Sequence, residues 1–345
     1  MEQQVTVPLP LNISAKELYL FKPYSTYKIA EQKISSHSNT FVTFSGFCVD
    51  AQGLIKGSHH DHPHQYQDYL AQIGYYYYDV VANPENLIRL DDDKVYLAIY
   101  HPWFNYYHWV TESIFRLWIA RDELDQSVVL LPEYYAQAGY IMQSLEPFGI
   151  KNFFFIPNGK SLMVRNLRVA AIKPVCDSFN KVHVREVRDF YVNYVFTKKK
   201  MAPSNIERLY VSRQLAGRRQ VIGEEKLMPI LEKYGFTIYY PEKHTFLEQV
   251  AIFAGVKYLV GMHGSGLTNM LFMPKGSSLF EYHKDHTNEL GHPSPLFWYM
   301  AEALEINYYH QSCLTHGHED YFTGDYLVDP EQFEQNIVLM LSCPK

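Results

Sequence analysis

The sequence contains few cysteines, and their spacing does not suit metal binding or redox chemistry. The 345 residues include four cysteines, Cys48, Cys176, Cys313 and Cys343, and none of them belongs to a C-x-x-C pair. Pairs of that kind carry most cysteine-based zinc and dithiol sites, so neither is expected here. Cysteines so far apart predict reduced, mostly buried thiols in a cytosolic protein.

Long apolar runs, a signal peptide and an excess of positive charge are also lacking. No window approaches the ~18 apolar residues of a membrane-spanning helix, which excludes such a helix. The first five residues, MEQQV, have neither the basic segment nor the apolar core of a signal peptide, which favours the cytoplasm. The net charge of −6 argues against nucleic acid as a partner, because proteins that bind it usually present a basic face.

Strands and helices alternate along most of the chain. From residue 94 the order is strand, helix, strand, helix, strand, which is typical of a parallel sheet, and the same alternation starts again at residue 208. The charged, proline-containing stretch 198–205 between them is the best linker. We therefore predict an α/β fold with two domains. These are residues 1–197 and 198–345, and the last helix, 329–341, is a candidate to cross back to the first domain.

Histidines are concentrated in one short segment, where four of the seven residues from Ser58 to His64 are His. Such a segment suggests a metal site, but the ligands crowd within one loop, Pro63 interrupts it, and no distant partner is evident. A solvated polar loop is therefore the expectation.

The stretch from Tyr258 to Asn269 has the features of an anion site. A short strand, Tyr258–Gly261, is followed by the loop His263-Gly264-Ser265-Gly266, and a helix is predicted to begin at Leu267. Free backbone N–H groups and the positive end of the helix dipole would point to one place, and glycines let a ligand approach closely. At the carboxyl end of a strand, this loop favours a phosphate and therefore a nucleotide.

Other polar residues are predicted to surround the same ligand. Arginines follow the first strand of the second domain, and arginine suits bidentate contact with phosphate. A carboxylate after the next strand is placed to accept ribose hydroxyls. The histidine of the loop contacts a phosphate or the nearby sugar, or only caps the helix. These residues are Arg213, Arg218, Arg219, Asn269, Glu281 and His263.

Several sequence blocks together resemble glycosyltransferase family 61, which includes bacterial capsular polysaccharide biosynthesis proteins and eukaryotic transferases of xylose and N-acetylglucosamine. The blocks run in the family's order between about residues 100 and 283. They are Asn105–Glu112 with Arg116, Tyr210–Arg213, Arg219–Glu225, Gly235-Phe236, Glu248-Gln249 and His263–Asn269. The chain departs from the family at Gly223, where Asn is usual, and at Ser265, where Ala is usual.

The resemblance implies a GT-B fold, in which two Rossmann-like domains face each other across a cleft. It also implies a nucleotide-sugar donor, with UDP as the expected carrier, bound in the C-terminal half with Glu248 among the contacts. The acceptor would be a glycan or a lipid-linked glycan of a surface polysaccharide, and a cytoplasmic enzyme could still touch the inner membrane peripherally. Inversion at the anomeric carbon without a metal or other cofactor is implied as well. The only D-x-D triplet, Asp91–Asp93, precedes a strand, where a surface turn is expected.

His108 and Glu112 are four residues apart, so they share one face of the predicted helix from Tyr107 to about Leu124. By themselves they favour a histidine satisfied by its own glutamate on a solvated face, but the resemblance favours a cleft-facing site. Inverting transfer needs a base, and a histidine held by a carboxylate suits that task. We predict His108 as base and Glu112 as orienter, with the reverse assignment left open.

Asn105 and Arg116 complete the predicted cleft, and Arg116 is expected either to pair with Glu112 or to reach the donor phosphates. Two other functions stay open: a nucleotide-sugar epimerase, and a catalytically silent scaffold that binds nucleotide or glycan. The donor sugar, the nucleotide base and the oligomeric state are not predicted.

Overall fold

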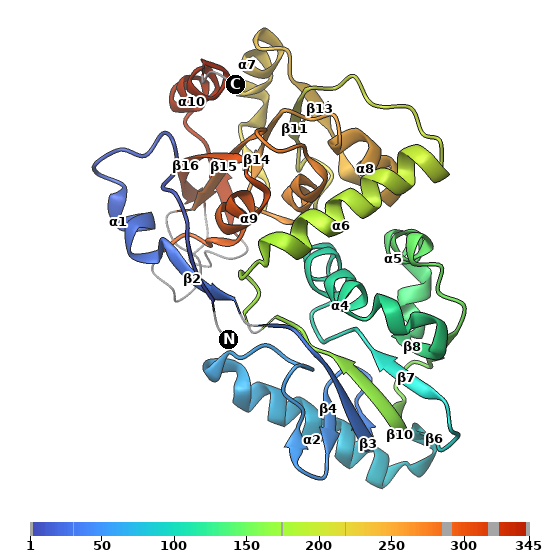
Figure 1. The fold of residues 1–345 in the computed structure, drawn as a ribbon. Helices are drawn as coiled ribbons and strands as arrows, with labels where there is room; N and C mark the ends of the chain where they lie inside the picture. The colour runs from blue at the N-terminus through green and yellow to red at the C-terminus, as the bar shows by residue number, and fades with distance from the viewer. Residues whose placement is uncertain are drawn as a thin grey trace. The chain divides into compact units, whose positions relative to one another are not determined.

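The computed structural model describes residues 3–29, 31–173, 175–217, 219–284, 292–316 and 324–342. Contacts within the chain divide it into two compact units. Unit 1 comprises residues 1–3 and 29–176, and unit 2 comprises residues 4–28 and 177–345. Each unit contains a sheet with helices packed on it, so the predicted α/β class is confirmed (Figure 1).

The sheet of unit 1 has the strand order β5-β4-β3-β10-β7-β8-β9, with β6 also paired to β10. The half made of β10, β7, β8 and β9 is parallel and corresponds to the predicted alternation, whereas β3, β4 and β5 join it in antiparallel fashion. The strands are β3 (Ile34–Val42), β4 (Cys48–Asp50), β5 (Gly53–Leu54), β6 (Leu87–Leu90), β7 (Val95–Ala98), β8 (Ser127–Pro132), β9 (Phe153–Ile156) and β10 (Ser161–Ala170).

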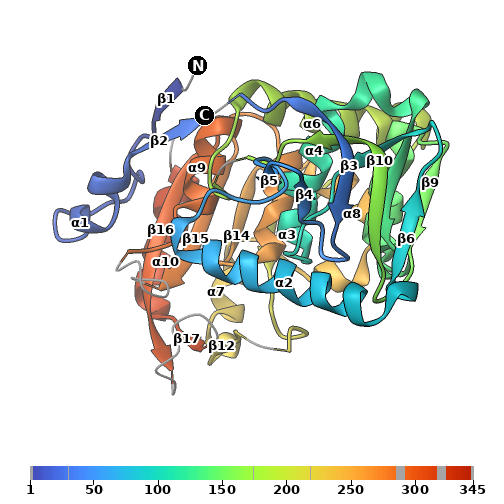
Figure 2. The same cartoon turned by 90° about the horizontal axis from the view of Figure 1, so that it is seen from below.

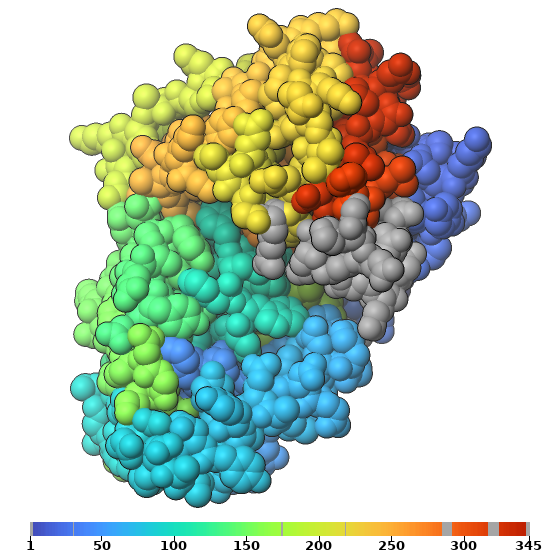
Figure 3. All heavy atoms as spheres, turned by 180° about the vertical axis from the view of Figure 1, so that it is seen from behind, coloured from blue at the N-terminus to red at the C-terminus, as the bar shows by residue number. Residues whose placement is uncertain are grey.

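The helices of unit 1 include one that the sequence did not predict, α2 (Tyr66–Ala82), whose blue-cyan surface is visible in the space-filling view (Figure 3). The predicted helix from Tyr107 consists of three consecutive helical segments, because a π-helical turn interrupts it. These are α3 (Tyr106–His108), the π turn η4 (Trp109–Ser113) and α4 (Ile114–Ile119), and they are followed by the 3-10 helix η5 (Arg121–Gln126) and by α5 (Gly139–Leu145).

The sheet of unit 2 has the order β12-β17-β16-β15-β14-β11-β13, and only the β16–β17 pair is antiparallel. Its central strands run side by side in Figure 2. The strands are β11 (Arg208–Val211), β12 (Val221–Ile222), β13 (Thr237–Tyr239), β14 (Tyr258–Met262), β15 (Ser278–Lys284), β16 (Asn307–His316) and β17 (Asp325–Leu327). The main helices are α6 (Lys181–Asn193), α7 (Met228–Lys233), α8 (Phe246–Phe253), the 3-10 helix η11 (Ser265–Phe272), α9 (Leu296–Leu304) and α10 (Pro330–Ser342). None of the helices in the described ranges is long and apolar enough to cross a membrane.

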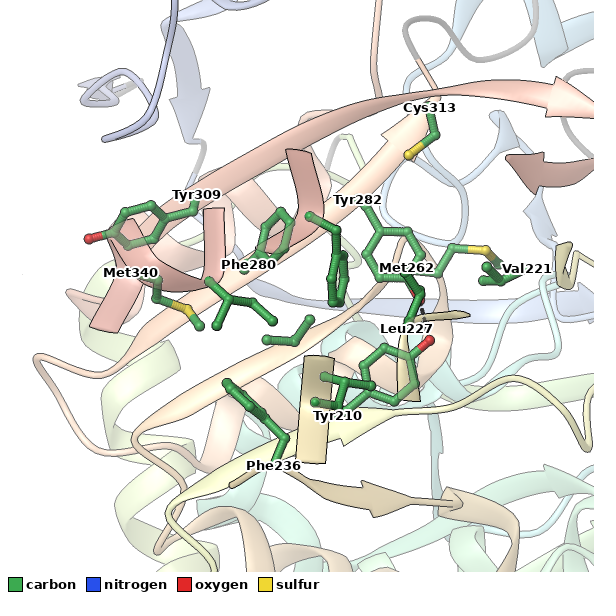
Figure 4. Packing of buried hydrophobic residues seen from close by; sticks show 14 of the residues in the cluster. Tyr210, Val221, Leu227, Phe236, Met262, Phe280, Tyr282, Tyr309, Cys313 and Met340 are labelled. Carbon is green, nitrogen blue, oxygen red and sulfur yellow. Dashed lines mark hydrogen bonds between the residues drawn. The ribbon is translucent and has the colours of Figure 1, made fainter. Parts of the chain in front are cut away.

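The last helix, α10, belongs to the core of unit 2. Its residues Phe333, Ile337 and Met340 are fully buried in one apolar cluster with Phe280 and Tyr282 of β15 (Figure 4). The amphipathic face that the sequence shows is therefore covered by the unit 2 sheet. The expectation that this helix crosses back to the first domain is corrected accordingly.

The division between the units also differs from the predicted boundary at residue 197. Helix α6 packs against α9, η11 and α8, so it belongs to unit 2 and the chain divides at Cys176–Asp177. The charged stretch 198–205 is then a connection within unit 2.

The N-terminal segment is a second departure, because residues 4–28 pack with unit 2. The segment contains β1 (Gln3–Thr6), α1 (Leu18–Phe21) and most of β2 (Thr26–Ile29). The indole Nε1 of Trp298 donates to the carbonyl of Pro8 at 2.7 Å. The Asn12 side chain donates to the His310 carbonyl at 2.7 Å and to Asn336 at 2.8 Å, and it accepts the His310 N–H at 3.0 Å.

Three of the four cysteines lie in the described ranges, and all three are free thiols, as predicted. Cys48 and Cys313 are buried, and burial raises the pKa of Cys48 to about 12. Cys343 lies outside the described residues.

Removing the Asn12 side chain should destabilise unit 2. Asn12→Ala leaves the buried backbone groups of His310 without their partner, which should lower the free energy of unfolding by roughly 1–3 kcal/mol in urea titrations. Tyr19→Ala is the control, because Tyr19 is an exposed side chain of the same segment. Equal stability of the two variants would show that the segment does not hold unit 2 together.

Candidate functional site

A buried carboxylate, that of Glu112, is the centre of a polar cluster in unit 1. Its oxygen Oε1 lies 2.9 Å from His60 Nε2, and its oxygen Oε2 lies 2.8 Å from His108 Nδ1. His101 Nε2 lies 2.7 Å from Oε2, a close electrostatic contact. The ammonium of Lys173 lies 4.0 Å from Oε1. One anion is thus surrounded by three imidazoles and a cation.

Segments that are separate in the sequence bring the three histidines and Glu112 together. His101 follows the buried strand β7, and His60 lies in the histidine-rich segment before α2. His108 ends α3, and Glu112 lies in the π turn η4, a type of turn that is rare and frequently found at functional sites. The predicted i,i+4 pair of His108 and Glu112 is therefore present.

Asn105 caps the same helix, because its Oδ1 accepts the backbone N–H of His108 at 3.0 Å. An N-cap asparagine satisfies an N–H that has no partner within the helix. Asn105 therefore fixes where the helix begins, and with it the position of the His108 backbone.

Burial and hydrogen bonding determine the charges in the cluster. Loss of hydration lowers the pKa of His101 to about 4, so this ring is neutral at pH 7. Burial alone would raise the pKa of Glu112, but His60, His108 and His101 lower it by more, and it ends well below its ordinary value. Glu112 is therefore a carboxylate.

Of the predicted pair, only His108 has an accessible side chain. Its exposed fraction is 14%, against 0% for the Glu112 side chain. When Nδ1–H donates to Glu112, the other ring nitrogen, Nε2, carries the lone pair. The arrangement therefore leaves an imidazole nitrogen of His108 as a hydrogen-bond acceptor.

The histidine-rich segment departs from its expected structure at His60. His60 is 2% exposed, so the expectation of a solvated loop is wrong for this residue. The distant partner that the sequence did not reveal is Glu112. The sequence signal that could have found it is the histidine cluster itself.

Ligand-type atoms of His60, His101 and Glu112 lie within 4.8 Å of one another, so these residues have the composition of a metal site. The tautomer of His101, however, does not suit metal binding. The backbone N–H of Trp103 donates to His101 Nδ1 at 3.3 Å, which places the ring proton on Nε2, the nitrogen that a metal would require. In this tautomer His101 presents an N–H, rather than a lone pair, toward Glu112.

Arg116 has a structural position, which corrects its predicted role. The side chain is fully buried, and its nitrogens donate to the carbonyls of Ala98, Tyr100 and Ala170. Burial lowers the pKa of Arg116 to about 10. Arg116 therefore ties β7 to β10 and neither pairs with Glu112 nor extends toward a ligand.

The glycine loop of unit 2 follows β14 as predicted, but the helix after it is the 3-10 helix η11, which begins at Ser265. The loop is closely packed: a Cβ on Gly264 would lie 2.8 Å from Arg213 Nη1, and one on Gly266 would lie 2.8 Å from Val211 Cγ1. A side chain at Gly266 would therefore displace Val211, one at Gly264 would displace the Arg213 side chain, and the Arg213 guanidinium lies directly against the loop.

The predicted arginines of unit 2 lie between β11 and β12. Arg213 Nε donates to the backbone carbonyl of Arg219 at 2.9 Å. This bond joins the loop after β11 to the residues before β12. Arg213 and Arg219 are both half-buried. Arg218 lies outside the described residues.

Glu281 repeats the arrangement of Glu112 and does not fit its predicted role. Its side chain is fully buried; Oε1 is 2.5 Å from His263 Nδ1, and Oε2 accepts from the Tyr308 hydroxyl at 2.7 Å. Both oxygens are thus occupied within the protein, which corrects the expectation that they accept ribose hydroxyls. His263, with 14% of its side chain exposed, is the member of this group that a ligand can reach.

Two other predicted donor contacts belong to the scaffold. Glu248 forms a capping box with Thr245 at the start of α8, and Asn269 is fully buried and donates to Gln249 at 2.6 Å. The structure therefore brings Arg213, Gly264 and Gly266 together at the loop and places Glu248 and Asn269 in supporting positions.

Acid should destabilise the protein below about pH 6.5. The folded-state pKa of His101, about 4, lies below its ordinary 6.5, so the unfolded chain binds more protons in that interval and stability falls as the pH falls. His62, also lowered to about 4, acts in the same direction, and Glu112 extends the loss below its ordinary 4.5. We expect Tm by calorimetry to be about 5 °C lower at pH 4.5 than at pH 7. A constant Tm over this interval would contradict a neutral buried His101.

Comparison with known proteins identifies the family of the chain. The family model described as "Glycosyltransferase 61" matches residues 106–280, just over half of the 345-residue chain. The chain is also similar to the EGF domain-specific O-linked N-acetylglucosamine transferase of Drosophila melanogaster, with 34% identity over 100 residues. That match spans 28% of this chain and 19% of the relative. The chain belongs to glycosyltransferase family 61.

Proposed function

We propose that this protein is an inverting glycosyltransferase that moves a sugar from a nucleotide-sugar donor to a hydroxyl group of a glycan acceptor. The observation that carries this function is the partly exposed His108, held by the buried carboxylate of Glu112. Family membership supports glycosyl transfer as the reaction class.

The proposed base is His108, and Glu112 orients it. The acceptor O–H gives its proton to His108 Nε2 while the oxygen attacks the anomeric carbon, on the face opposite the leaving group. The bond from that carbon to the phosphate oxygen breaks, and its electron pair leaves with the nucleoside diphosphate. Glu112 stabilises the imidazolium that forms. The reverse assignment is disfavoured because the Glu112 side chain is fully buried.

The donor diphosphate is proposed to bind at the glycine loop of unit 2, with UDP as the expected carrier. Support comes from the Arg213 guanidinium beside Gly264 and from the position of the loop at the N-terminal end of η11, where backbone N–H groups point toward a ligand. His263, held by Glu281, would contact the same phosphates. These groups would stabilise the negative charge that develops on the leaving diphosphate, so the proposed mechanism uses no metal ion.

We further propose the GT-B arrangement, in which the groups of both units serve one reaction. The support is that each unit has parallel strands of its own and that the candidate groups follow strand ends, β7 in unit 1 and β11 and β14 in unit 2. In open α/β sheets, ligands bind outside the carboxyl ends of the strands.

Replacing the base should abolish transfer while leaving donor binding intact. His108→Ala is expected to lower kcat by about 10²–10⁴-fold, measured by mass spectrometry of acceptor glycans incubated with nucleotide sugars. The Kd for UDP should not change, because the proposed donor site is in unit 2. The control is His64→Ala, an exposed histidine of unit 1. Undiminished transfer by His108→Ala would exclude His108 as the base, and an isomerised sugar formed from donor alone would identify an epimerase instead.

Replacing the arginine at the loop should weaken donor binding. Arg213→Ala removes charge-assisted hydrogen bonds, so the Kd for UDP in calorimetry should rise by roughly ten- to hundredfold. Arg165→Ala is the matched control, because Arg165 is a mostly exposed arginine of unit 1. The same Kd for both variants would place the diphosphate elsewhere.

A further inference from the structure

The proposed base depends on the orientation of Glu112, and the link to His108 alone does not fix that orientation. The last torsion of a glutamate side chain is broad, so a carboxylate held by one partner rotates readily. In this protein the other oxygen, Oε1, is held by His60 at 2.9 Å, which leaves Oε2 directed at His108. His101 adds a contact of 2.7 Å to the same Oε2.

Trp103 fixes both of these additional histidines. Its ring stacks on the His60 ring, with centroids 4.4 Å apart and planes at 23°. Its backbone N–H donates to His101 Nδ1, so the ring proton of His101 lies on Nε2 and faces Glu112. One residue, which lies between β7 and α3, therefore positions His60 and sets the tautomer of His101.

The cluster is shielded from water, and its other charged neighbours are few. The side chains of His60 and His101 are each 2% exposed, and that of Lys173 is 8% exposed. Near His60 lies His62, whose pKa is lowered to about 4 by burial and by the neighbouring histidines, so it is neutral at pH 7. The orientation of Glu112 is therefore set mainly by the imidazoles that contact it.

We propose that His60 and His101 are positioning residues for glycosyl transfer: they hold Glu112 so that His108 keeps its proton on Nδ1 and presents the Nε2 lone pair to the acceptor hydroxyl. The assignment rests on the proposed role of His108 as base. Neither histidine touches the acceptor; both act through Glu112. If they only satisfied a buried carboxylate, their loss would lower stability without changing the tautomer of His108 or the ratio of kcat to KM.

A pair of amide substitutions separates these two roles. The side-chain nitrogen of Gln reaches about as far as histidine Nε2, whereas Asn is too short to reach Glu112. His60→Gln should therefore keep kcat within a few-fold of wild type, and His60→Asn should lower it by roughly ten- to hundredfold with the KM for donor unchanged. The matched control is His64→Asn, an exposed histidine of the same segment.

The tautomer itself is measured without substrate by ¹⁵N NMR of the imidazole nitrogens. Wild type and His60→Gln should show His108 protonated on Nδ1, and His60→Asn should show a mixture of both tautomers. At His101, too, the Gln variant should keep His108 protonated on Nδ1, and the Asn variant should show a mixture of tautomers. This measurement stays valid if transfer activity is not found, so a failure of the proposed function and a failure of the positioning role are distinguishable.

Several results would overturn the positioning role. One is the finding that His108 of the wild-type protein is protonated on Nε2. This measurement does not depend on whether any variant folds. Another is the same kcat and the same His108 tautomer in the Gln and Asn variants, whether both variants match wild type or both are impaired. Stoichiometric metal in the purified protein, lost in the variants, would assign His60 and His101 to a metal site instead.

Discussion

The burial of one carboxylate, that of Glu112, constrains how unit 1 packs. An ionised side chain without water costs several kcal/mol unless hydrogen-bond donors or opposite charge surround it. Glu112 obtains these partners from three places in the chain: the segment before α2, the residues after β7 and the turn before η4. The segments must meet for the anion to be buried, so the packing of unit 1 and the geometry of His108 depend on the same contacts.

Unit 2 uses the same principle with different partners. Glu281 is buried between the partly exposed His263 and the hydroxyl of Tyr308, and both Glu281 and Tyr308 lie on adjacent parallel strands, β15 and β16. Each unit thus presents one imidazole that is backed by a carboxylate inaccessible to solvent. Side chains fixed by a second layer of contacts on regular elements hold their geometry better than side chains on free loops.

The features predicted from sequence are those that local pattern encodes. Strands such as β8 and β14 are short, nearly continuous apolar runs, as expected for buried parallel strands, and the His108–Glu112 pair follows from helical spacing. The sequence did not reveal His60 as a partner, because the contact joins residues 52 positions apart and exists only in the folded unit. Glu281 was assigned to a ligand because an acidic residue near a strand end has the same local pattern whether it faces solvent or a neighbouring strand. Helix α2 contains a run of four tyrosines, and aromatic residues have high β-propensity, so the local pattern does not indicate a helix there.

The path of the chain has a consequence for synthesis. Residues 4–28 belong to unit 2, yet the rest of that unit begins only at Asp177, so unit 1 is inserted into unit 2. During synthesis, residues 4–28 are made before unit 1, whereas β16, which carries their partner His310, is made after it. Unit 1 can therefore fold before residues 4–28 can bind β16. Two covalent connections, near Lys28 and near Cys176, join residues 29–176 to unit 2. Proteolytic cleavage of one connection therefore leaves the two units joined by the other.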